Sequence, residues 1–263
     1  MTDTTTHTTD PATIDPGAAA DRQERQVEQI SHVVVRFAGD SGDGMQLTGD
    51  RFTSASALFG NDLSTFPDYP AEIRAPAGTV NGVSSFQVHI SDHDITTPGD
   101  APNVLVAMNP AALKADLHRL EQNGLLIVNS DAFETRDLEK AGYDHNPLHD
   151  DFLSSYRLVE IPMTSLTQKA TELLGVKARD SERSKNFFAL GVISWLYSRP
   201  TEPTVEWIEA RFKDLVKASN LAAFKAGYNF GETSELFDHP YQVKPAQLPT
   251  GEYTNITSNV ALA

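Results

Sequence analysis

The sequence predicts an α/β fold in which helices flank a doubly wound, mostly parallel sheet. Short, strongly apolar runs alternate along the chain with segments of helical spacing, as expected for strands that are covered on both faces. The first of these runs leads through a glycine-rich turn directly into a helical pattern. Hydrophobic residues make up 40% of the 263 residues, which is enough for one sizeable core.

The first half of the chain opens with a strand, a turn and a helix. Residues 32–37 are nearly continuous in apolar character, residues 39–44 are rich in glycine, and residues 45–59 have helical spacing that ends at Gly60. Two prolines in residues 64–70 limit any strand there to a short or edge piece. Further strands are predicted at residues 84–91 and 103–108.

The second half continues the alternation. Asn109 and Pro110 open a helix that runs to residue 120, and strands follow at residues 125–129 and 156–161. Residues 130–155 are polar and are expected to form an irregular surface excursion. The remaining predicted helices are residues 165–174, 184–197, 204–217 and 218–227. The helix at residues 184–197 is apolar on most faces and is expected to be buried. The helices at residues 204–217 and 218–227 are expected to form a C-terminal helical cap. Together these elements describe a Rossmann-like sheet.

Composition excludes several classes of function. With 21 basic and 36 acidic residues the formal charge is −15, which argues against a nucleic-acid surface. The absence of cysteine excludes disulfides and cysteine-ligated zinc or iron–sulfur sites in this chain, so any cluster must be on a partner. We assign none of the eight histidines to catalysis or to a metal site. Residues 1–28 contain no apolar run and are expected to be a disordered leader of a cytoplasmic protein, with no membrane segment.

The glycine-rich turn at residues 39–44 is the principal candidate site. A turn between a buried strand and a helix offers unpaired N–H groups and a helix dipole to an anion, although it also forms without any ligand. A dinucleotide would use the opposite glycine spacing. Gly42, Asp43 and Gly44 match the first letters of a thiamin diphosphate motif, but the Asn pair that completes it is missing. Coenzyme A is the third candidate, and Asp40 and Asp43 would repel its phosphates unless they point away or bind polar groups of the ligand.

Four stretches in the same order carry a family resemblance. Residues 33–49, from Val33 to Gly49, resemble the opening of the gamma domain of 2-oxoacid:ferredoxin oxidoreductases. Residues 70–78, 104–113 and 185–191 resemble its later signatures. The resemblance covers roughly residues 31–231. Ser41, Gly42 and Asp43 stand where the family commonly has a Gly pair and a Gln, and this variant resembles the 2-oxoglutarate type, in which gamma and alpha domains are fused.

The resemblance implies a function for the domain. It implies oxidative decarboxylation of a 2-oxoacid to an acyl-CoA with reduction of ferredoxin, in a multisubunit complex whose beta subunit and neighbouring domains hold thiamin diphosphate, Mg²⁺ and the iron–sulfur cluster. Residues 29–250 would form the gamma-type domain, which binds coenzyme A and contributes to subunit assembly. Residues 251–263 would begin the following, thiamin-pyrimidine-side domain, because capping residues there precede a helix that stops within a turn. A non-catalytic assembly module and, less favoured, a nucleotide-dependent dehydrogenase are the alternatives.

The candidate cofactor-binding residues lie in the turn and in the later signatures. Arg74 is part of the coenzyme surface or of a structural pair with Glu72, and Asn109 is a ligand-binding residue at a strand end or a helix cap. Lys185 and Asn186 reach a phosphate or carbonyl, or tie the loop to the helix. No residue is assigned a catalytic role. The full set is Gly39, Asp40, Ser41, Gly42, Asp43, Gly44, Met45, Arg74, Asn109, Lys185 and Asn186.

Overall fold

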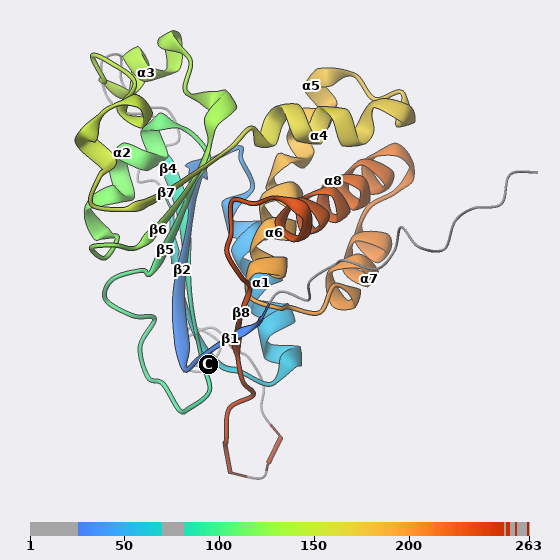
Figure 1. Cartoon of the computed structure of the whole chain (residues 1–263). Coiled ribbons are helices and arrows are strands. Elements are labelled where there is room, and N and C mark those ends of the chain that lie inside the picture. Colours follow the sequence, from blue (N-terminus) through green and yellow to red (C-terminus); the bar gives the residue numbers. More distant parts are fainter. Residues whose placement is uncertain (1–25, 70–81, 250, 253–255, 257–261, 263) are drawn as a thin grey trace, which may run out of the picture.

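A six-stranded sheet forms the centre of the computed structural model, which describes residues 26–69, 82–249, 251–252, 256 and 262 (Figure 1). Its strands run in the order β3-β4-β2-β5-β6-β7. They are β2 (His32–Asp40), β3 (Asp62–Asp68), β4 (Val83–Ser91), β5 (Val104–Ala107), β6 (Leu125–Asn129) and β7 (Arg157–Ile161). β2, β5, β6 and β7 are parallel, and β4 is antiparallel to both of its neighbours. The predicted mostly parallel sheet is therefore confirmed.

Helices cover both faces of the sheet (Figure 1). The α-helices are α1 (Met45–Phe59), α2 (Pro110–Asp116), α3 (Thr135–Ala141), α4 (Met163–Thr171), α5 (Ala178–Ser181), α6 (Lys185–Leu196), α7 (Glu202–Arg211) and α8 (Asp214–Thr233). The 3₁₀ turns are residues 117–119, 130–132, 147–149, 151–153, 172–174 and 182–184. α1, α4, α6, α7 and α8 lie on one side of the sheet, and α2 and α3 lie on the other.

The two faces of the strands supply two separate cores. Val33, Val35 and Phe37 of β2 point into the larger core, which also contains α6, whereas Ala38 points into the core beneath α2 and α3. α6 is buried along almost its whole length, as its apolar composition predicts. It packs closely on α8, because a Cβ at Gly227 would lie 2.0 Å from the carbonyl oxygen of Phe188.

Two boundaries differ from the sequence-based expectation. Residues 130–155 are not wholly irregular, since they contain α3, whose Leu138 packs into the smaller core and whose Ala141 is buried. Two apolar residues are too few to produce a helical periodicity in the sequence. The cap helices divide at Phe212 and not at residue 217, because the Phe212 ring packs edge-on against the rings of Phe187 and Trp207 and its backbone is extended.

A second, two-stranded parallel sheet joins the ends of the described chain. It pairs β1 (Glu28–Ile30) with β8 (Tyr241–Val243), and the sequence analysis did not predict it. Glu28, the last residue of the expected leader, is the first residue of β1. Three sets of residues lie outside the described part of the chain: residues 1–25, Arg74 together with Glu72, and most of residues 251–263.

Candidate functional site

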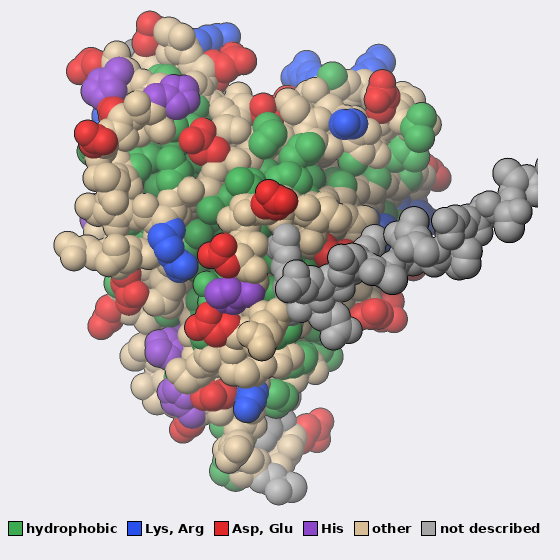
Figure 2. Space-filling model, in the orientation of Figure 1, with side chains coloured by type: hydrophobic (Ala, Val, Ile, Leu, Met, Phe, Trp, Pro, Cys, Tyr) green, Lys and Arg blue, Asp and Glu red, His purple; other side chains and the backbone are tan. Residues whose placement is uncertain are grey.

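A cavity of about 380 Å³ lies at the carboxyl ends of β2, β5 and β6. β2 is followed by α1 on one side of the sheet and β5 by α2 on the other, so this is the point where the chain switches faces. Open α/β sheets bind ligands at such switch points. The molecular outline is indented between the part that contains α3 and the part that contains α4 and α5 (Figure 2). The cavity is lined from both of these parts.

The glycine-rich turn forms one wall of the cavity and is tightly held. The Asp43 amide donates to the Asp40 carbonyl at 2.9 Å, which closes the turn. Gly39 lies within β2, and a Cβ there would approach the Asp43 carboxylate to 2.9 Å. Gly44 has φ 76°, and a Cβ on it would lie 2.6 Å from the Asn186 side-chain nitrogen. Both glycines are therefore required by local packing, and Gly44 also by its backbone conformation.

The Asp43 carboxylate occupies the inside of the turn. Its Oδ2 accepts from the Asp40 backbone N–H at 3.0 Å and from the Asn109 side-chain amide at 3.2 Å. Its Oδ1 lies 3.0 Å from the Lys185 ammonium, and both side chains are largely buried. A carboxylate of the protein thus takes a backbone donor and a cation that an external phosphate would need.

Asp40 is the second carboxylate of the turn and faces the cavity. Burial raises its pKa, the neighbouring charge of Asp43 raises it further, and the Asn109 amide and the Lys185 ammonium offset only part of this effect. Its Oδ1 is buried and has no hydrogen-bond partner among the described residues. Asp40 therefore adds a second, partly desolvated carboxylate to the wall of the cavity.

The structure brings four of the predicted residues to this cavity. Asp40, Asp43, Asn109 and Lys185 all line it. Burial acts to lower the pKa of Lys185, but the carboxylates of Asp43, Glu182 and Asp40 outweigh burial and raise it. Asn109 caps α2 by accepting from the Ala112 N–H at 2.8 Å, so its structural role is real. The assignment of these residues to cofactor binding stays a prediction.

The other predicted residues that the structure describes do not line the cavity. Ser41 and Gly42 are exposed at the tip of the turn, and no atom lies within 4 Å of a Cβ built on Gly42. The Met45 side chain is buried in the larger core, and Met45 is the first residue of α1. Asn186 is buried beneath Gly44, and its Oδ1 has no partner among the described residues.

Several lining residues were missed by the sequence analysis. Asn129 is the last residue of β6, much as Asn109 follows the end of β5. The Oδ1 of Asn129 accepts from the N–H groups of Met163 and Thr164 at the start of α4. The repeated Asn at the ends of neighbouring strands is the signal that could have found it. The other polar or charged lining residues that were missed are Asp131, Glu134, Asp137, Lys140, Thr164 and Glu182.

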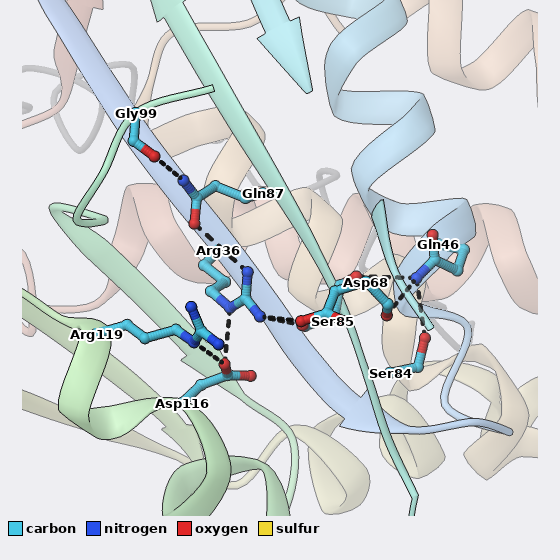
Figure 3. Close-up of polar contacts among 9 residues, drawn as sticks. All are labelled: Arg36, Gln46, Asp68, Ser84, Ser85, Gln87, Gly99, Asp116 and Arg119. Carbon is cyan, nitrogen blue, oxygen red and sulfur yellow. Dashed lines mark hydrogen bonds and ion pairs between the residues drawn. The ribbon is translucent and has the colours of Figure 1, made fainter. Parts of the chain in front are cut away.

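A buried arginine ties together the strands behind the turn (Figure 3). Arg36 is a charged residue within the otherwise apolar strand β2, and its side chain is only 1% exposed. Its Nε donates to Asp116 of α2 at 2.9 Å, and its Nη2 donates to Asp68 of β3 at 2.8 Å. Gln46 of α1 donates to the Asp68 carbonyl at 3.2 Å. This network fixes α1 and the end of β3 relative to β2, and so holds the wall of the cavity.

Comparison with known proteins places the chain in a family. The sequence profile of the pyruvate ferredoxin/flavodoxin oxidoreductase family matches residues 34–230, which include the turn, the cavity and most of the described helices. The chain belongs to this family. The resemblance seen in the sequence is thereby confirmed.

Two curated relatives are named as parts of 2-oxoglutarate enzymes. The chain is 56% identical over 248 residues to the 2-oxoglutarate oxidoreductase subunit KorA of Mycobacterium tuberculosis, an alignment that covers 94% of this chain and 37% of that subunit. It is 30% identical over 203 residues to the 2-oxoglutarate synthase subunit KorC of Methanothermobacter thermautotrophicus, covering 73% of this chain and 92% of that one. The chain thus spans little more than a third of KorA and corresponds to most of KorC.

Solved structures show the same fold. The 2-oxoglutarate:ferredoxin oxidoreductase of Magnetococcus marinus, determined with 2-oxoglutarate, coenzyme A and succinyl-CoA bound, matches with a TM-score of 0.63 and 25% identity, over 83% of this chain and 34% of that one. The gamma subunit of a keto/oxoacid ferredoxin oxidoreductase from Geobacter sulfurreducens matches with a TM-score of 0.52 and 20% identity, over 77% of this chain and 99% of that one. The second match supports the fold alone.

The described part of the chain contains neither a membrane-spanning helix nor a cluster of metal-binding side chains. Among the described residues, no helix has the length and apolar character needed to span a membrane. In the same part of the chain, no three side chains of His, Asp or Glu converge in a way that would hold a metal ion.

Proposed function

We propose that this chain is the gamma-type domain of a 2-oxoglutarate:ferredoxin oxidoreductase and that it contributes to coenzyme A binding and to subunit assembly. The observation that carries the proposal is the 56% identity to KorA over 94% of the chain. The structure that matches with a TM-score of 0.63 is an enzyme of this type with coenzyme A bound. In this proposal residues 29–250 form the domain, residues 1–28 are a leader and residues 251–263 begin the next domain.

The proposed reaction converts 2-oxoglutarate and coenzyme A to succinyl-CoA and carbon dioxide, while two molecules of oxidised ferredoxin take up one electron each. Thiamin diphosphate supplies the carbanion chemistry of decarboxylation when it is bound, and clusters carry the electrons away. The chain contains no cysteine, so the clusters lie on the beta subunit or on another partner. Thiamin diphosphate and Mg²⁺ likewise lie outside this domain, and the complex is a cytoplasmic hetero-oligomer.

The residues at the switch-point cavity fit a role in holding coenzyme A. The cavity volume of about 380 Å³ falls in the range of roughly 300–1,000 Å³ that is usual for ligand pockets. The turn that forms one wall of the cavity is braced by Asp43 and Lys185, so this wall is held in shape before a ligand arrives.

The alternative of a pure assembly module also has an observation in its favour. Asp43 fills the inside of the turn, and carboxylates dominate the lining of the cavity. Both features disfavour an anionic ligand and suit a surface that docks against a neighbouring domain.

A matched pair of variants at Gly42 tests the proposal in the intact complex with its beta subunit. A side chain at Gly42 meets nothing within 4 Å, so both Gly42→Ala and Gly42→Asp fold normally. The assay follows viologen or ferredoxin reduction with 2-oxoglutarate at varied coenzyme A. Gly42→Asp is expected to raise KM for coenzyme A several-fold through charge repulsion, and Gly42→Ala to leave it unchanged. Equal KM values for both variants would favour the assembly module.

A further inference from the structure

Four large apolar side chains are exposed at one end of the helices α4 and α8. Leu173 and Leu174 follow α4 in the turn at residues 172–174, and they are 100% and 37% exposed. Leu215 and Val216 lie in the first turn of α8 and are 48% and 57% exposed. These four residues form the α4–α8 patch. A single exposed apolar residue is ordinary, but several that gather in one place mark an interaction surface.

The fold holds the two halves of the patch next to each other. α8 packs against α4 and against the turn at residues 172–174, and Figure 1 shows the end of α4 and the start of α8 at the same end of the helices. Ser184 donates to Asn220 in the second turn of α8 at 2.7 Å, which fixes the segment after the turn to α8. Gly175 ends the turn with φ 69°, a conformation that favours glycine. The patch therefore belongs to one packed surface.

Positive charge surrounds the patch in the sequence. Within four positions of the four apolar residues the chain has five basic and two acidic side chains, a formal charge of +3 in a chain whose total is −15. The basic residues are Lys169, Lys177, Arg211, Lys213 and Lys217, and the acidic ones are Glu172 and Asp214. In the described part of the chain none of the five basic side chains forms an ion pair, and all but Lys217 are exposed. Figure 2 shows basic side chains near apolar ones at this end of the molecule.

The charge of this surface decides which kind of partner it fits. A symmetric contact with a second copy of the chain would bring two positively charged faces together, which is unfavourable. A permanent subunit interface is large and depleted of charge, whereas a small apolar surface with a charged rim is typical of partners that bind and leave. A small acidic protein with an apolar spot on its surface complements both parts.

Resting on the proposed function, we propose that the α4–α8 patch and its basic rim are a docking surface for the acidic electron carrier, the ferredoxin of the proposed reaction. The carrier gains one electron, which a cluster of the beta subunit loses, and it then has to leave, so a small surface with steering charges suits it. Because the clusters lie outside this chain, the patch holds one side of the carrier while its cluster faces the beta subunit. None of the four patch residues lines the switch-point cavity, so this contact is separate from the coenzyme site proposed above.

The test compares two electron acceptors in the intact complex, supplied with 2-oxoglutarate and coenzyme A. One is an acidic ferredoxin, and the other is methyl viologen, a small dye that needs no protein docking surface. Leu173→Ser is expected to raise KM for ferredoxin about 3- to 10-fold, as for an apolar side chain that loses part of its burial, and to leave the rate with methyl viologen unchanged. Leu58→Ser is the matched control, because Leu58 is 71% exposed on α1, outside the patch.

Charge reversal tests the basic rim separately. Lys213→Glu is expected to raise KM for ferredoxin about 2- to 5-fold at about 0.1 M salt, as for an exposed ion pair. The difference should vanish at about 1 M salt, where the Debye length is roughly 3 Å, whereas the effect of Leu173→Ser should persist. Lys244→Glu makes the same charge change at an exposed site after β8 and is expected to leave KM for ferredoxin near that of the unmodified complex.

The other outcomes overturn this inference or the proposed function, and they are distinguishable. KM values for ferredoxin that are equal in the patch variants and their controls would remove the docking surface. Loss of the methyl viologen rate in Leu173→Ser or Lys213→Glu would make the patch part of the permanent assembly. Unchanged KM for ferredoxin together with lost binding to phosphatidylserine vesicles would assign the face to a membrane surface. An unmodified complex that reduces neither acceptor would refute the proposed function itself.

Discussion

Replacing Arg36 by Met is expected to destabilise the folded chain by about 3 kcal/mol or more, the lower part of the range for breaking a buried ion pair. The cost arises at Asp116, whose side chain is 4% exposed and would lose the Nε donor at 2.9 Å. Arg119 lies 3.3 Å from the same oxygen but is 45% exposed, so it compensates only in part. The contact with Asp68 contributes little, because that carboxylate is 40% exposed and regains water.

The assay is urea unfolding of the chain followed by circular dichroism, at pH 7 and at pH 5. Burial raises the pKa of Asp116, and the Arg36 charge opposes this, so the variant raises that pKa further. A folded-state pKa above the unfolded value means that the penalty is present at high pH and is lost as the pH falls through the folded pKa. The deficit is therefore expected to be smaller at pH 5 than at pH 7.

A double variant provides the control for Arg36. Arg36→Met combined with Asp116→Leu removes both charges, and it is expected to recover most of the lost stability, because apolar residues of similar size replace a buried pair at little cost. A single variant within about 1 kcal/mol of the unmodified chain, or a double variant no more stable than the single one, would refute the reasoning.

Three further variants test other parts of the structure. Gly227→Ala forces a methyl group against the Phe188 carbonyl and is expected to lower the free energy of unfolding in urea by about 1–3 kcal/mol or more. The control variant Gly42→Ala places its methyl group in open space and is expected to leave stability unchanged. Equal stability of the two variants would contradict the close packing of α6 on α8. Asp40→Asn is expected to stabilise the chain at pH 7, because burial and then the charge of Asp43 raise the pKa of Asp40. The gain in unfolding free energy should vanish as the pH falls toward 3.8, the ordinary pKa of an Asp side chain. A gain that is independent of pH would argue against a buried charge. Asn129→Ala removes the acceptor for two N–H groups of α4 and is expected to lower the free energy of unfolding by about 1–3 kcal/mol. Asn129→Asp retains that acceptor and is expected to be more stable than Asn129→Ala. A lower unfolding midpoint for Asn129→Asp than for Asn129→Ala would exclude the capping role.

Much of the candidate site was accessible to sequence reasoning because it follows strand ends. The turn after residues 32–37 and Asn109 after β5 could be placed at one edge of the sheet once the strands were predicted to be parallel. The acidic lining could not, because Asp131 and Asp137 come from α3 and its approach, a segment without periodicity, and Glu182 comes from the far side of the cavity. Their convergence depends on how α3 and the segment before α6 pack, which local patterns do not encode.

The sequence by itself determined the order of the six central strands and of the longer helices, the turn between β2 and α1 and the membership of the family. These features depend on local hydrophobic periodicity, on glycine at fixed positions and on ordered motifs, all of which are properties of neighbouring residues. Only the tertiary structure decided that Arg36 is buried between two carboxylates, that β1 pairs with β8 and that Asp43 contacts Asn109 and Lys185. Each of these results from contacts between distant segments, where burial and charge are set by packing rather than by the adjoining sequence.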